Sequence, residues 1–278
     1  MSQMRVICLF LVCVCVTTGG VSSGAGPLDR LYNLWDSVVS RHVQGGAMEG
    51  IPLHIVDYEA ISKDGNYTAF IEGVAKVNLS GLDNNNTYAF FMNVYNALAI
   101  KMIIDHPCVH PTTGSCHPIK SIRDIGSLLH PVWGLPAGTV GGKMWTLDQV
   151  EGFLRHPPHP LKEDSRLHAC IVCASISCPN VRMEAYRREQ VGEQMDSQVK
   201  DFLSNSKKGL SLDRSANTLT LSPIFLWFAG DFKSYGGVKQ FTSHYLTPSD
   251  ADYIAKNNPE LHYFSYDWNL NGVPPCTC

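Results

Sequence analysis

The sequence lacks the features that mark nucleic-acid binding and membrane spanning. Its 22 basic and 25 acidic residues give a formal net charge of -3, and the basic residues form no dense run. Nucleic-acid-binding surfaces need concentrated positive charge, so we expect no nucleic-acid partner. No stretch beyond the N-terminal segment reaches the roughly 18 apolar residues of a membrane-spanning helix. We therefore expect no membrane span.

Several enzyme signatures are also missing. The chain has no Gly-x-Ser-x-Gly motif, no glycine-rich phosphate loop followed by lysine and no His-Glu-x-x-His zinc helix. Asp148 and Glu151 share one short predicted helix, where acidic residues near a helix start explain them more simply than a glycosidase pair. Cysteine and histidine are frequent in residues 105–118, but without the paired spacing of a zinc site. We expect no metal and no cofactor.

The N-terminal segment has the pattern of a secretory signal peptide. A short region with Arg5 precedes the apolar run 6–16, and small residues follow at 17–25. We therefore assign residues 1–25 to the signal peptide and expect a secreted, extracellular protein in which 26–278 form a single domain. Three Asn-x-Ser/Thr sequons predict glycosylation at Asn66, Asn78 and Asn85.

An odd number of cysteines follows the signal peptide, which leaves at least one thiol unpaired within the chain. The seven are Cys108, Cys116, Cys170, Cys173, Cys178, Cys276 and Cys278. Disulfides form in secreted proteins, and the loop between Cys108 and Cys116 is the simplest to close. Cys276 and Cys278 are candidates to fix the C-terminal tail. The pairing itself does not follow from the sequence.

The strongest predicted element is a helix over residues 88–105. Apolar side chains occupy nearly its whole circumference, which is typical of a buried helix. Asn93 and Asn96 lie three residues apart on it and need hydrogen-bond partners. They either brace neighbouring loops or orient a reacting group. Amphipathic helices are predicted at 27–42, 147–156 and 187–206, and a β-hairpin at 210–213 and 218–221.

Residues 166–180 concentrate reactive side chains. The apolar run 167–172 predicts a buried strand, and 175–180, with Pro179, predicts the turn that ends it. On a strand, His168 and Cys170 would share a face, with Cys173 beginning the turn. This segment is either a core strand with inert thiols or the place where a thiolate nucleophile and its base meet.

Six blocks of the chain resemble the family known as domain of unknown function 547. They are residues 56–58, 89–98, 121–125, 147–151, 168–179 and 266–271. The family is similar to papain-like and transglutaminase-like folds. That similarity implies an α+β single domain, in which a central buried helix packs against a mainly antiparallel sheet and amphipathic helices flank both.

The resemblance also implies a set of site residues: Asn93, Tyr95, Asn96, Glu151, His168, Cys173, Ser177 and Cys178. Three positions depart from the related patterns. Asn93 stands where papain-like enzymes carry their cysteine, so thiol chemistry would come from the turn. Ala174 replaces the family's usual glycine, so a positive φ there would be strained. The family's Glu-His pair is Glu151-Gly152 here.

Two hypotheses follow from these residues. The first is a non-catalytic extracellular binding or matrix protein, in which Cys173 is bridged to Cys178 and an extracellular protein is the partner. The second is a cysteine-dependent amide or peptide hydrolase or acyl transferase acting on a small amide-containing ligand. In it, Cys173 or Cys178 is the nucleophile and His168 the base, while Asn93 or Asn96 orients the base or donates to the oxyanion.

Overall fold

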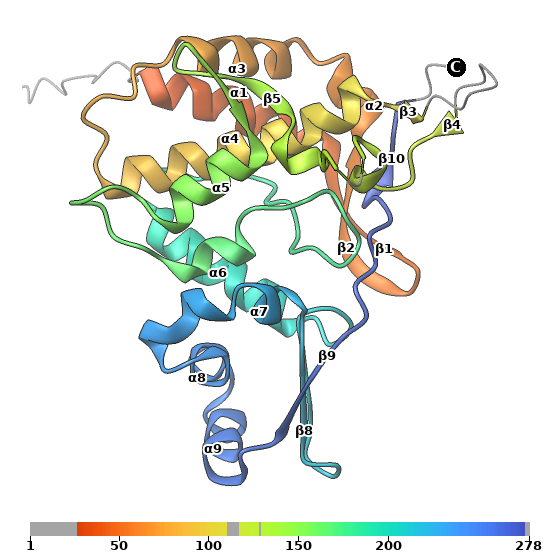
Figure 1. The fold of residues 1–278 in the computed structure, drawn as a ribbon, viewed down its shortest axis with the longest axis vertical. Coiled ribbons are helices and arrows are strands. Elements are labelled where there is room, and N and C mark those ends of the chain that lie inside the picture. Colours follow the sequence, from red (N-terminus) through yellow and green to blue (C-terminus); the bar gives the residue numbers. More distant parts are fainter. Residues whose placement is uncertain (1–26, 110–116, 128, 276–278) are drawn as a thin grey trace, which may run out of the picture.

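The chain folds into an α+β domain built around one buried helix (Figure 1). The computed structural model describes residues 27–109, 117–127 and 129–275. The predictions for the signal peptide and for Cys116, Cys276 and Cys278 lie outside these residues. The predicted pairing of Cys108 with Cys116 therefore stays a prediction.

The helices and strands alternate along the chain without repeating. The helices are α1 (Pro27–His42), α2 (Tyr58–Ser62), α3 (Gly65–Lys76), α4 (Asn84–Asp105), α5 (Leu147–Arg155), α6 (Val191–Ser204), α7 (Ile224–Trp227), α8 (Val238–Ser243) and α9 (Pro248–Asn257). The strands are β1 (Val43–Met48), β2 (Ile51–Asp57), β3 (Cys108–Val109), β4 (His117–Pro118), β5 (Pro136–Val140), β6 (Lys143–Thr146), β7 (Leu210–Asp213), β8 (Thr218–Leu221), β9 (Glu260–Tyr263) and β10 (Gly272–Val273). Four 3-10 turns complete them: η1 (Ile122–Asp124), η2 (Val132–Gly134), η3 (Ser165–Ala169) and η4 (Ala229–Tyr235).

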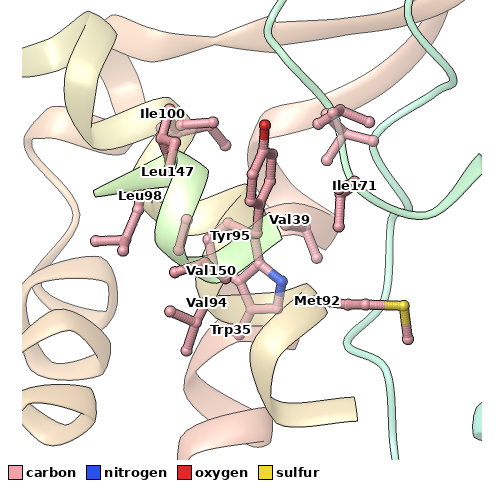
Figure 2. Packing of buried hydrophobic residues seen from close by; sticks show 14 of the residues in the cluster. Trp35, Val39, Met92, Val94, Tyr95, Leu98, Ile100, Leu147, Val150 and Ile171 are labelled. Atoms are coloured by element: carbon pink, nitrogen blue, oxygen red, sulfur yellow. The ribbon is translucent and has the colours of Figure 1, made fainter. Parts of the chain in front are cut away.

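Helix α4 is the centre of the larger hydrophobic core. Asp83 caps its start by accepting the Asn86 N–H at 2.8 Å. Its side chains are buried on every face, as the sequence predicts, because α1, α2, α5, α6 and β5 pack against it. Figure 2 shows Tyr95 of α4 among Trp35 of α1, Val150 of α5 and Ile171. Although α4 is apolar enough to cross a membrane, 89% of its most apolar window is buried inside the domain.

A smaller core lies in the C-terminal part of the chain. There α6 and α7 pack with η4, α8 and α9 against the sheet β7-β8-β9, in the lower half of Figure 1. The predicted hairpin is confirmed, since β7 pairs antiparallel with β8 and Leu210 lies opposite Leu221. Strand β9 then adds in parallel to β8. This core faces the larger one across the segment that holds His168, which packs against Phe228 and Phe232.

Strand pairing differs from the expectation of one sheet. The described residues form four small sheets, β1-β2-β10, β3-β4, β5-β6 and β7-β8-β9, and most of their pairings are antiparallel. Strand β5 of the β5-β6 sheet packs against α4, and the sheet β7-β8-β9 covers part of the smaller core. The helices therefore supply most of the surface against which α4 is buried.

The predicted strand at residues 167–172 is wrong. The structure has the 3-10 turn η3 there, followed by irregular chain. The segment is buried as expected, but Asn96 of α4 satisfies its backbone in place of a strand partner. As a result His168 and Cys170 do not share a face: His168 lines a cavity, whereas the Cys170 thiol donates to the Arg166 carbonyl at 3.3 Å.

Candidate functional site

A cavity of about 290 Å³ opens where the two cores meet. Its wall comes from α4, α5 and η2, from η3 and the segment after it, from the α7 region, and from the residues after β9. The lining residues are Tyr95, Trp133, Asp148, Glu151, His168, Ile171, Cys173, Cys178, Ile224, Trp227, Phe228, Tyr266 and Trp268. Five of the residues implied by the family resemblance are therefore brought together here: Tyr95, Glu151, His168, Cys173 and Cys178.

The two asparagines of α4 lie beneath this cavity and do not line it. Asn96 donates to the Cys170 carbonyl and accepts the Val172 N–H, both at 2.9 Å. Asn93 makes the same pair of bonds with Tyr186, at 2.8 and 2.9 Å. Both amide groups are thus engaged with backbone. This arrangement favours bracing over the predicted roles as orienter or oxyanion donor.

The turn that carries the cysteines is strained at one residue. Ala174 has φ 59°, in the left-handed region that favours glycine. The turn thus has a positive φ at the position where the family resemblance implies glycine. The turn is held from the C-terminal segment, because Ile176 N–H donates to the Asn269 carbonyl at 2.8 Å. Ser177 is buried, and its Oγ accepts the Asp267 N–H at 2.8 Å, so it does not reach the cavity.

Cys173 and Cys178 form a coupled thiol pair. Both are free cysteines, so the bridge expected by the binding hypothesis is absent, and their Sγ atoms lie 2.6 Å apart. Cys178 Sγ also accepts the Cys173 N–H at 3.0 Å and the Tyr266 hydroxyl at 3.2 Å. Two donors aimed at Cys178 favour a thiolate on Cys178 and a thiol on Cys173.

The same contacts set the titration of the pair. Burial would raise the pKa of Cys178, but hydrogen bonds from the Cys173 thiol and the Tyr266 hydroxyl lower it to about 6. The pKa of Cys173 is raised, because its proton is held by Cys178 and because the thiol is buried. At neutral pH the cavity therefore holds one nucleophilic sulfur and one proton donor beside it.

A carboxyl with an altered pKa stands on the α5 wall. The Glu151 side chain is 17% exposed, and its nearest cation is Arg155 Nη1, at 3.9 Å. Burial raises the pKa of Glu151 to about 7, although Arg155 opposes the change. Asp148 lies one turn earlier, and burial raises its pKa as well. Glu151 can therefore donate or accept a proton near neutral pH, which a general acid or base requires.

His168 belongs to a charged network on the same side of the cavity. Its Nε2 lies 2.8 Å from Asp231 Oδ2, and Arg155 binds both oxygens of Asp231, at 2.7 and 3.0 Å. Burial lowers the pKa of His168 despite the bond to Asp231, so the ring is neutral at pH 7. Asp231 holds the ring through Nε2, which leaves Nδ1 as the basic nitrogen. Within the described residues, no hydrogen bond joins this ring to either sulfur.

Aromatic rings surround the outer part of the cavity. Trp227 stacks on Trp268 with ring centroids 5.6 Å apart, and Tyr266 lies 4.5 Å from Trp268. Trp133 meets Trp268 edge-on at 5.7 Å. Trp227 remains 47% exposed, so it presents a flat apolar surface to solvent beside the thiol pair. This surface suits a planar or apolar group of a ligand.

Four residues of the site are missed by sequence reasoning: Arg155, Lys208, Asp231 and Tyr266. Tyr266 begins the block 266–271, which resembles the family, and this position is the sequence feature that could have identified it. Asp231 and Arg155 carry no local pattern, because their roles come from contacts between residues 76 positions apart. Lys208 reads as a surface lysine beside Lys207, yet its side chain is buried.

The predicted glycosylation residues lie on the larger lobe. Asn78 and Asn85 are exposed, whereas Asn66 is partly buried and its amide donates to Ser37 Oγ at 3.0 Å. Asn78 and Asn85 are thus free to carry a glycan, and a glycan on Asn66 would compete with its bond to Ser37.

Comparison with known proteins gives one match. Residues 79–203 match the family model described as protein of unknown function, DUF547, and no curated protein and no solved structure matches the chain. The matched segment contains both cysteines, His168 and Glu151, while Asp231 and the aromatic residues from Trp227 onward lie beyond it. Residues 79–203 thus place this part of the chain in the DUF547 family.

Proposed function

We propose that this protein is a cysteine-dependent hydrolase or acyl transferase, with Cys178 as its nucleophile. The observation that carries the proposal is the pair of free thiols, 2.6 Å apart, on the wall of a cavity that also holds Glu151 and His168. A structural thiol pair needs neither a cavity nor titratable groups opposite it. A nucleophile needs both.

The first half-reaction transfers an acyl group to sulfur. The Cys178 thiolate attacks the carbonyl carbon of an amide or ester, an S–C bond forms, and the carbonyl electron pair moves to oxygen. The Tyr266 hydroxyl, which already donates to this sulfur, can then donate to that oxyanion. When the tetrahedral intermediate collapses, the C–N or C–O bond breaks. The leaving group takes its proton from Glu151, whose pKa of about 7 keeps the carboxyl partly protonated.

The second half-reaction regenerates the thiolate. Water, or an amine or alcohol acceptor, attacks the thioester and loses its proton to Nδ1 of His168, and collapse of the tetrahedral intermediate breaks the S–C bond and releases the Cys178 thiolate. The proton on His168 then returns, through solvent, to the Glu151 carboxylate, so that both groups regain their starting protonation. Asp231 stabilises the imidazolium that forms, because its carboxylate lies 2.8 Å from Nε2 and its own pKa is held well below the usual range by His168 and Arg155. His168 thus acts in deacylation, and Cys178 ionises through its neighbours instead of through the histidine.

The walls define the substrate class. A cavity of about 290 Å³ encloses a small group only, and Trp227, Tyr266 and Trp268 offer ring faces to it. We propose a small amide or ester whose acyl or leaving group is planar or apolar. The predicted signal peptide and sequons support a location outside the cell for this activity.

The test is alkylation followed by turnover. Iodoacetamide should label Cys178 in the folded protein, with a half-maximal rate near pH 6, as read by peptide mass mapping. On a panel of small aryl esters and anilides, Cys178→Ser should lose about 1000-fold or more of kcat/KM. The control is Cys170→Ser, because Cys170 is equally buried but lies outside the cavity. Equal turnover by the two variants would disprove the role of Cys178.

A binding function without turnover is the second candidate. The exposed ring of Trp227 beside Trp268 favours it, since such surfaces also hold ligands that are never transformed. If the wild-type chain binds panel members, as seen by tryptophan fluorescence, but converts none of them, the chain is an extracellular binding protein on the same scaffold.

A further inference from the structure

Lys208 is a buried cation directly behind the cysteine turn. It lies after α6 and before β7, in the turn that Asn205 closes by accepting the Gly209 N–H at 2.8 Å. Only 2% of Lys208 is exposed. Its Nζ donates to the Ile176 carbonyl at 3.2 Å, the Cys178 carbonyl at 2.7 Å and Asn180 Oδ1 at 3.0 Å. The three protons of the ammonium are therefore all used on one turn.

This ammonium has no carboxylate partner among the described residues. Asp201 approaches only through Asn180, whose amide donates to Asp201 Oδ2 at 2.8 Å. A buried charge without a counter-charge is costly, and the usual result is deprotonation. Burial does lower the pKa of Lys208, to about 8, but the negative charge of the Cys178 sulfur opposes this change together with Asp201.

We infer that Lys208 is a positioning residue of the thiol site: its ammonium is the counter-charge of the Cys178 thiolate and fixes the carbonyls of the turn that presents it. One of its three acceptors is the carbonyl of Cys178 itself, so the cation and the sulfur are held on the same residue. The inference rests on the proposed thiolate of Cys178, but it concerns how that thiolate is maintained.

Other ionisable groups also face this sulfur. Cys173 and Tyr266 contact it, and Glu151, Tyr58 and Tyr95 feel its charge from α5, α2 and α4. None of these five is a cation. Lys208 does not contact the sulfurs, but it interacts with them electrostatically, and its charge favours ionisation, while the tyrosine and the second thiol act through hydrogen bonds.

The first experiment compares Lys208→Met with Lys208→Arg and with the exposed neighbour variant Lys207→Met. The readout is the pH dependence of iodoacetamide labelling at Cys178. Lys208→Met should move the half-maximal pH upward by about one unit, because an opposite charge of this kind is worth one to three units. Labelling at pH 6 would then slow about fivefold. Lys208→Arg should restore most of the shift, and Lys207→Met should leave the profile unchanged. A wild-type profile in folded Lys208→Met overturns the inference.

The second measurement keeps Lys208 in place, in case its removal prevents folding. Coupling between two charges is reciprocal, so removal of the thiolate must lower the pKa of Lys208. The 13C shift of the Lys208 ε-carbon is followed against pH in the wild type and in Cys178→Ser. A fall in the lysine pKa of about one unit supports the inference. An unchanged lysine pKa overturns it.

These readouts separate this inference from the proposed activity. Both are measured on the free protein and need no substrate. If Lys208→Met shifts the pH dependence of Cys178 labelling but the wild type turns over no substrate, the counter-charge role of Lys208 stands and the enzyme proposal fails. If turnover requires Cys178 but the profile ignores Lys208, the enzyme proposal stands and the inference fails.

Discussion

Two sets of buried polar groups differ in how completely their hydrogen bonds are made. One set is the amides of Asn93 and Asn96, and the other is the cavity groups Cys173, Cys178 and Glu151. The amides of Asn93 and Asn96 are buried beneath the cysteine segment, and each makes two hydrogen bonds to backbone at 2.8 to 2.9 Å. The groups above them are less well satisfied: the Sγ atoms of Cys173 and Cys178 lie 2.6 Å apart, and Glu151 lies 3.9 Å from its cation. The amides support the segment, whereas the cavity groups are buried without full hydrogen bonding.

The difference predicts opposite signs for mutations. Where every hydrogen bond is made, a replacement leaves buried partners unsatisfied and destabilises the protein. Where a group is buried against its preference, a replacement removes a cost and stabilises the protein. The free energy of unfolding in denaturant therefore distinguishes the two sets, which we call the amide layer (Asn93 and Asn96) and the cavity layer (Cys173, Cys178 and Glu151).

Asn96→Ala carries the largest expected effect. It leaves the Cys170 carbonyl and the Val172 N–H without partners in the core, and each such group costs about 1–3 kcal/mol, so we expect a loss of about 4 kcal/mol. The matched control is Asn85→Ala on the exposed first turn of α4, which should stay within about 0.5 kcal/mol of the wild type. A loss below about 1 kcal/mol for Asn96→Ala would show that this layer does not brace the segment.

The sequence predicted the fold correctly where the structure is local, and it failed at the segment that Asn96 supports. Helices are local, so the apolar spacing of residues 27–42 and 88–105 predicted α1 and most of α4, and residues 210–221 predicted the β7-β8 hairpin. Residues 167–172 failed because a short apolar run shows burial but not conformation. The deciding contact is Asn96, seventy-four residues from Cys170, which replaces a neighbouring strand.

The candidate site was predictable only where its chemistry was local. Cys173, Cys178 and His168 stand close in the sequence, and the family resemblance added Glu151 and Tyr95. The contacts that give these residues their properties are not local. Asp231 reaches His168 across 63 positions, and Tyr266 reaches Cys178 across 88. Residue type indicated which groups can react, while the tertiary fold decides which of them are ionised.

Glu151→Gln tests the cavity layer through pH. The folded pKa of about 7 lies above the unfolded value of 4.5, so unfolding releases protons in this range and stability falls as pH rises from 4.5 to 7. The contribution of the neutral carboxyl is complete below pH 4.5 and lost above pH 7. Since Gln does not ionise, the variant should equal the wild type near pH 4 and exceed it by about 2 kcal/mol at pH 8.

The control for this prediction is Glu163→Gln, because Glu163 is an exposed carboxyl that pairs with His156 at the surface. Its stability should follow the wild type across the same pH range. If Glu151→Gln and the wild type have parallel pH profiles, Glu151 is an ordinary ionised carboxylate. The proposed general acid would then be excluded.

Ala174→Gly has the smallest expected effect on the free energy of unfolding. The sign of this effect decides whether the backbone of the turn is strained. At φ 59° an alanine costs about 1 kcal/mol more than glycine, and this gain is partly offset by the greater entropy of glycine in the unfolded chain. We expect Ala174→Gly to stabilise the protein by up to about 1 kcal/mol. Ala185→Gly, at a buried alanine with negative φ, should destabilise it by at least as much. If both variants destabilise the protein, Ala174 is not strained. The cavity layer would then consist of the two thiols and Glu151, without the backbone of the turn.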